Sequence, residues 1–168
     1  AIATGLCSGS QFWVPGGEKV LPTATCALIK ASLGARFDRT CPFFRICDLF
    51  VGETTCDGKK KAWEILAEDA PMYIMDIPQL KRPADFTKWE AEIHGYIKRI
   101  EELTGNKITA EKLHDAIVLV NNKRRALQRL NAVRKAKNVP ISGRDVLLIH
   151  QIAFYDDPTR FTQMVNKL

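Results

Sequence analysis

The sequence predicts an α/β fold, in which a parallel sheet layer at the start of the chain is followed by a helical subdomain. Two short apolar runs with a helix-forming segment between them lie within residues 48–75, and helical periodicity dominates from residue 83 onward. All five cysteines and seven of the ten glycines precede residue 83. We therefore expect an α/β domain over residues 1–82 and a helical subdomain over residues 83–168.

The bulk composition is that of a soluble globular protein. Hydrophobic residues make up 46% of the chain and charged residues 26%. No apolar run is long enough to cross a bilayer, so we expect no membrane attachment. The odd number of cysteines, without a CxxC pair, argues against a secreted disulfide scaffold. A cytoplasmic protein with buried or metal-binding thiols fits better.

The α/β domain is predicted from four consecutive segments. Residues 48–51 form a short apolar run bounded by turn residues, which indicates a buried strand, and residues 52–58 form a polar loop. Residues 59–68 are typical of a helix, and residues 72–75 of a second buried strand. A strand–helix–strand unit has parallel strands and a right-handed crossover, so this layer should be a partial Rossmann-like sheet.

Helices are predicted at five further places, one before the strands and four after them. Residues 26–33 precede Gly34 and favour a short helix. Apolar residues at helical spacing continue from residue 89 to residue 103, before a stop at residues 104–106. The last three helices have predicted N-caps at Thr109, Ser142 and Asp157. The amphipathic pattern of the long helix after Thr109 requires a packing partner.

The loop over residues 52–58 is the strongest candidate site. It follows a predicted parallel strand and leads into a helix, and ligands of open α/β sheets bind at that edge. The positive end of the helix dipole favours the thiolate form of Cys56, which can bind iron or act as a nucleophile. A buried structural cysteine is the alternative. The loop could also bind a phosphate, but it lacks the P-loop spacing.

Other cysteine chemistry is less well supported. A cysteine hydrolase needs a histidine base, and all three histidines of the chain lie in predicted helices far downstream. Zinc is disfavoured because the cysteines lack paired ligand spacing. Cys26 lies near a possible helix start, and Cys41 should be extended because Pro42 follows it. The cysteine spacing differs from that of ferredoxins, so a cluster held by separate loops stays open.

Basic residues are concentrated in one segment of the chain. The formal net charge is +6, and residues 121–138 contain seven Lys or Arg residues and no acid. A solvated helix face is one interpretation, and a noncatalytic module that binds an acidic partner or nucleic acid is the other. Nucleic acid is not expected, because no aromatic or motif residues accompany the basic ones.

Three local motifs are more specific than the spacing of the cysteines. The segments 21–32, 41–44 and 48–61 occur in an order that resembles the 2-hydroxyacyl-CoA dehydratase and benzoyl-CoA reductase family. The most specific of these is TTCDGKKK at residues 54–61. The similarity continues through Trp89 and as far as the helix that contains Arg125, so it spans nearly the whole chain.

The resemblance implies a [4Fe–4S] cluster bound by cysteines from separated loops. Cys26 and Cys56 match the cluster-binding cysteines of the family, and Cys41 is a lesser candidate in a matching CP motif. Cys7 and Cys47 are expected to be structural. Ala27 departs from the family, which often has proline there. The remaining residues expected to line the cluster and substrate loop are Glu53, Thr54, Thr55, Asp57 and Gly58.

The resemblance also implies a reaction and partners. In this family an ATP-hydrolysing activator delivers one electron, and the acyl-CoA substrate forms a ketyl radical that expels its α-hydroxyl group to give an enoyl-CoA. A homologous second subunit, or a second copy of the chain, is expected. Some relatives instead hold a double-cubane cluster and reduce small molecules. Because relatives are markedly longer, we expect this chain to be a part of such a subunit and inactive alone.

Overall fold

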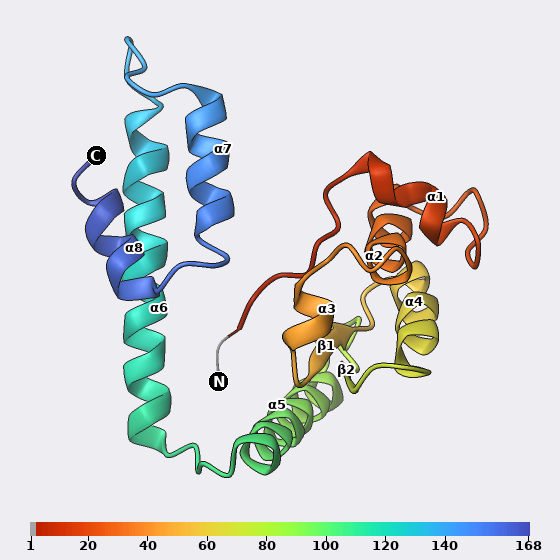
Figure 1. Cartoon of the computed structure of the whole chain (residues 1–168). Helices are drawn as coiled ribbons and strands as arrows, with labels where there is room; N and C mark the ends of the chain where they lie inside the picture. Colours follow the sequence, from red (N-terminus) through yellow and green to blue (C-terminus); the bar gives the residue numbers. More distant parts are fainter. Residues whose placement is uncertain (1–2) are drawn as a thin grey trace. The chain divides into compact units, whose positions relative to one another are not determined.

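The computed structural model describes residues 3–168, which form two compact units (Figure 1). The first unit is Leu6–Asn106, and the second contains Lys107–Leu168 together with the residues just before Leu6. The division between the units therefore lies some 24 residues later than the change from strands to helices near residue 82. The helix that follows residue 82 packs on the sheet, and this contact groups it with the first unit.

The first unit contains the parallel strand–helix–strand arrangement that the sequence predicts. Its elements are β1 (Phe50–Glu53), α4 (Asp57–Ala67) and β2 (Met72–Met75). The two strands pair in parallel, with Phe50 opposite Met72. The α/β prediction is thus confirmed, although β1 starts two residues later than expected and continues to Glu53. Pairing with β2 draws the first residues of the predicted loop into the strand.

The helix before the sheet is longer than its sequence suggests. It is α2 (Ala27–Phe37), and it continues through Gly34, where the sequence indicated a stop. Gly34 lies against the segment formed by η1 (Gln11–Trp13) and α1 (Val14–Gly17). A Cβ atom on Gly34 would lie 1.8 Å from the carbonyl oxygen of Trp13, so only glycine permits this approach.

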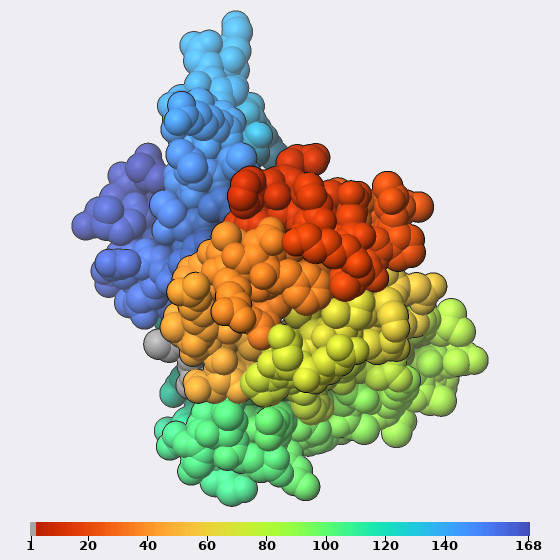
Figure 2. Space-filling model, turned by 45° about the vertical axis from the view of Figure 1, so that its right-hand side comes forward, coloured from red at the N-terminus to blue at the C-terminus, as the bar shows by residue number. Residues whose placement is uncertain are grey.

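The core of the first unit lies between α2 and α4. It consists of Leu21, Ile29, Leu33, Ala62 and Leu66. The short helix α3 (Phe43–Ile46) adds Phe44, whose ring stacks on that of Phe50 with centroids 4.9 Å apart. In the space-filling view, the orange surface that includes α3 borders the yellow surface that includes α4 (Figure 2). The packing of these core residues positions α2 and α4, the two helices that follow the motif cysteines Cys26 and Cys56.

The helix α5 (Pro83–Thr104) completes the first unit. It lies on β2, and the rings of Tyr73 and Tyr96 are 5.6 Å apart at their centroids. It ends at Gly105, which has a positive φ of 69° that disfavours residues with a side chain.

The second unit consists of α6 (Ala110–Val133), α7 (Gly143–Ile152) and α8 (Pro158–Val165). Figure 1 shows α7 and α8 beside the long α6. The three predicted N-caps are confirmed: the side chains of Thr109, Ser142 and Asp157 each accept a hydrogen bond from a backbone N–H in the first turn. The core of this unit is formed by Ala126, Leu130, Phe161 and Val165.

None of the helices described within residues 3–168 has both the length and the apolar character that a membrane span requires.

Candidate functional site

The two motif cysteines have the same place in two different helices, because each is an N-cap residue. Cys26 precedes α2 and Cys56 precedes α4, and both residues are exposed. The backbone oxygen of Cys26 accepts a hydrogen bond from the backbone N–H of Lys30 at 3.1 Å. The Cys56 sulfur accepts one from the backbone N–H of Lys59 at 3.4 Å. The Cys26 side chain makes no such cap hydrogen bond, so Cys56 alone of the two caps its helix with its sulfur. Both residues lie at the positive end of a helix, which favours an anionic ligand.

The two helix N-termini adjoin each other. A Cβ atom on Gly58, in the first turn of α4, would lie 2.9 Å from Ile29 Cδ1 and 3.6 Å from Thr25 Cγ2. It would also lie 3.9 Å from the sulfur of Cys56. Because Thr25 directly precedes Cys26, the segments that carry the two cysteines meet at Gly58. The structure thus brings together two segments whose motif cysteines are 30 positions apart in the sequence.

The loop before Cys56 is held by hydrogen bonds to its backbone and side chains. The Trp63 indole N–H donates to the carbonyl oxygen of Glu53 at 3.0 Å. The Glu53 carboxylate accepts from the Thr55 backbone N–H at 2.7 Å and forms an ion pair with Lys59. A Cβ atom on Gly52 would lie 2.7 Å from the Trp63 indole nitrogen, so the indole packs directly on the strand backbone. The loop therefore has a fixed conformation.

A second set of contacts ties the same loop to β2 and α5. The Thr54 hydroxyl donates to the Asp76 carboxylate at 2.9 Å and accepts from the Ile77 backbone N–H at 3.0 Å. Asp76 also forms an ion pair with Lys88 on α5. Hydrogen bonds, first from Lys88 and then from Thr54, lower the pKa of Asp76. Thr54 therefore has a structural role in the loop.

The two other predicted loop residues have different surroundings. The Asp57 side chain is 99% exposed and its carboxylate pairs with Lys60 at 3.2 Å, which leaves it accessible to a ligand or a partner. Gly58 provides the contact between the two helix N-termini. Of the five predicted loop residues, Asp57 is thus the one whose side chain extends fully into solvent.

The Glu53 carboxylate makes the loop sensitive to acid. Burial raises the pKa of Glu53, but hydrogen bonds from Lys59 and Thr55 outweigh burial and hold the pKa below its ordinary value of 4.5. A carboxyl group whose folded-state pKa is depressed stabilises the fold above its unfolded-state pKa, and this contribution is lost as pH falls through the folded-state pKa. The Trp63 indole N–H resonance should therefore shift in acid with a midpoint below pH 4.5.

The control for this titration is Glu53→Gln, which should remove the shift of the Trp63 resonance. A midpoint at or above pH 4.5, or a shift that survives in Glu53→Gln, would contradict the assignment.

Cys41 lies in a group of thiols of its own. Its side chain is fully buried. Burial, followed by a hydrogen bond with Cys41, raises the pKa of Cys7 to about 11. Burial, followed by the proximity of Cys41, also raises the pKa of Cys47. Nothing in the spacing of these three cysteines indicated that they would gather.

The exposed cysteines (Cys26 and Cys56) and the group around the buried Cys41 (Cys7, Cys41 and Cys47) differ as possible metal ligands. Within residues 3–168, no three His, Cys, Asp or Glu side chains converge in a way that could hold a metal ion. Cys26 and Cys56 are exposed at the starts of two adjoining helices, and each offers one sulfur donor. Sulfur donors suit iron–sulfur clusters, and two helix N-termini favour an anionic group, so the pair fits a part of a cluster site.

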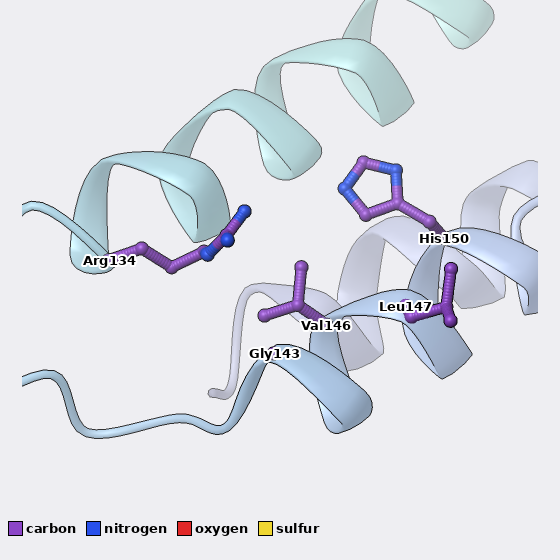
Figure 3. Close-up of a pocket in the computed structure, with 5 residues that line it drawn as sticks. All are labelled: Arg134, Gly143, Val146, Leu147 and His150. Atoms are coloured by element: carbon purple, nitrogen blue, oxygen red, sulfur yellow. The ribbon is translucent and has the colours of Figure 1, made fainter.

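A separate hollow of about 290 Å³ lies in the second unit. Its lining residues are Arg134, Gly143, Val146, Leu147 and His150. In Figure 3 the side chains of Arg134 and His150 point toward the same space, above Val146. None of the five cysteines lines it.

Comparisons with known proteins cover the whole chain. The family model described as 2-hydroxyglutaryl-CoA dehydratase, D-component, matches residues 1–168. YjiM of Escherichia coli (strain K12), which is provisionally named a dehydratase subunit, is 41% identical over 150 residues. The match covers 89% of this chain and 39% of YjiM, so the chain spans about two fifths of the length of that relative.

Proposed function

Because the chain belongs to the 2-hydroxyglutaryl-CoA dehydratase D-component family, we propose that it forms part of the cluster-binding domain of a 2-hydroxyacyl-CoA dehydratase subunit. The observation that carries this proposal is that the segments preceding two helices, each with a motif cysteine as its N-cap, meet at Gly58. Cys26 and Cys56 lie in the motifs that match the cluster-binding cysteines of the family. Their sulfur atoms would supply two of the ligands of a [4Fe–4S] cluster.

Other residues of the chain would support Cys26 and Cys56 as ligands. The N-termini of α2 and α4 favour the negative charge of a bound cluster. The contacts of Glu53 with Lys59, Thr55 and Trp63 fix the loop that carries Cys56. When bound, the cluster would supply a Lewis acid and an electron relay for the reductive, radical dehydration of a 2-hydroxyacyl-CoA to an enoyl-CoA.

We propose that the remaining ligands of the cluster come from outside these 168 residues. Two cysteines supply fewer donors than a stable cluster requires, and YjiM is more than twice as long as the matched region. A homologous subunit or a second copy, an ATP-dependent activator and an acyl-CoA are the expected partners, in the cytoplasm. A double-cubane reductase would use the same two cysteines and is the alternative.

The basic segment gives less support to a noncatalytic binding module. Several of its cations are engaged within their own unit: Lys123 donates to the carbonyl oxygen of Ala153 at 3.0 Å, and Arg129 binds the side chain of Asn166. These contacts favour a solvated helix face that also ties α6 to its neighbours.

The function is tested by turnover. The assay would use a protein that joins this chain to the segments by which YjiM exceeds it, with activator, ATP and 2-hydroxyglutaryl-CoA under anaerobic conditions. We expect Cys56→Ala to abolish enoyl-CoA formation, measured by mass spectrometry, while Cys47→Ala retains it. The 168-residue chain alone should give no product. Unchanged turnover by Cys56→Ala, or turnover by the chain alone, would contradict the proposal.

A further inference from the structure

Lys30 has an unusual environment for a lysine. Among residues 3–168, Lys30 is the one charged residue that is buried, with 5% of its surface exposed. Its ammonium group donates hydrogen bonds to the Glu18 carboxylate at 2.6 Å and to the carbonyl oxygen of Thr23 at 2.7 Å. Both partners lie in the segment between α1 and α2, which ends at Cys26.

Burial of an ammonium group is unfavourable unless it is paired and hydrogen-bonded, as it is here. The effect of the pairing is to hold an irregular segment in place. Between α1 and α2 the chain has only two turns. In the first, the backbone N–H groups of Val20 and Leu21 donate to the carbonyl oxygen of Gly17, and in the second the Thr25 backbone N–H donates to the carbonyl oxygen of Pro22 at 2.9 Å. Leu21 fixes the start of this segment in the core.

The backbone of Lys30 is fixed as well. Its N–H donates to the carbonyl oxygen of Cys26 in the first turn of α2. On the other side, a Cβ atom on Gly17 would lie 2.1 Å from the carbonyl oxygen of Lys30, so α1 packs directly on this turn. The side chain of Lys30 is thus anchored to a rigid support, and its head group reaches back over the residues that lead to Cys26.

We propose that Lys30 is a positioning residue for the metal site, which ties Glu18 and Thr23 to the first turn of α2 and thereby fixes Cys26 at the start of α2, where this helix adjoins the first turn of α4. The inference rests on the proposed function, because it assigns Cys26 as a cluster ligand. Lys30 itself touches neither cluster nor substrate in this arrangement.

The test compares Lys30→Met with the double variant Glu18→Met/Lys30→Met. The single change removes both hydrogen bonds of the ammonium group and leaves Glu18 without its cation. The double change also removes that carboxylate, so it restores electrical balance without restoring the tie to Thr23. The matched control is Lys61→Met, because Lys61 is an exposed lysine that pairs with Glu64 on α4.

Two properties of the extended protein used for the turnover assay would be measured. The first is the rate at which an anaerobically reconstituted sample loses iron to a chelator, together with the electron paramagnetic resonance spectrum of the reduced cluster. The second is hydrogen exchange of the backbone amides at residues 21–26 in the metal-free chain. We expect both Lys30 variants to lose iron about tenfold faster than the parent, with an altered spectrum and faster exchange. Lys61→Met should match the parent.

The outcomes separate this inference from the proposed function. Iron loss at the parent rate, with an unchanged spectrum, in either Lys30 variant would overturn the positioning role even if exchange increases. A parent chain that takes up no iron would overturn the proposed function. In that case exchange alone decides: unchanged exchange at residues 21–26 overturns the inference, and faster exchange in both Lys30 variants supports it.

Discussion

Replacement of Gly34 by valine is expected to destabilise the first unit by about 3 kcal/mol or more. The Cβ atom of any larger residue would lie 1.8 Å from the carbonyl oxygen of Trp13 and 3.1 Å from the backbone nitrogen of Gly17. Both neighbours are backbone atoms, so no side-chain rotation relieves the clash, and α1 must move away from α2. Urea unfolding followed by circular dichroism would measure the change in the free energy of unfolding.

The matched control for this change is Gly9→Val. No atom lies within 4 Å of a Cβ atom built on Gly9, so the added side chain has open space. A free energy of unfolding for Gly34→Val within 1 kcal/mol of the Gly9→Val value, taken as about the error of such measurements, would show that α1 does not pack on α2 as described.

Replacement of Phe161 by alanine is expected to destabilise the second unit by about 3 kcal/mol or more. The Phe161 ring is 2% exposed and joins α8 to Ala126 and Leu130 on α6. Its loss removes buried apolar surface and leaves a cavity in the main core of a small unit. Hydrogen exchange of the α6 and α8 amides would measure the effect, which should not reach α2 if the two units unfold separately.

Met164→Ala is the control, since it shortens a side chain on the same helix that is 57% exposed. Equal protection of the α6 amides in the two variants would contradict the assigned core of the second unit.

The features that the sequence predicts correctly depend on neighbouring residues. The N-caps at Thr109, Ser142 and Asp157 follow from side chains that can reach a backbone N–H two or three residues later. The parallel strand–helix–strand unit follows from apolar runs bounded by turn residues. Strand and helix bounds are less accurate, as at Gly34, because a glycine that permits close packing has the same sequence signal as one that ends a helix.

The features that the sequence does not predict depend on contacts between distant segments. Gly58 meets Thr25 and Ile29 because α2 and α4 share a core, and no local pattern encodes that meeting. The buried ammonium group of Lys30 has no signal either, since an isolated lysine is usually exposed.

The same limit applies to the division of the chain into units. The contact between Tyr73 and Tyr96 places α5 with the sheet, whereas helical periodicity alone groups it with the later helices.

The central claim is that Cys26 and Cys56 together hold an iron–sulfur cluster. The most direct measurement is the content of iron and acid-labile sulfide per chain after anaerobic reconstitution of the extended protein used for the turnover assay, in the parent, Cys26→Ala, Cys56→Ala and the control Cys47→Ala. We predict that the parent and the control bind iron and sulfide in equal amounts and that both other variants lose them. Iron and sulfide retained in either of those two variants, or absent from the parent, would contradict the claim.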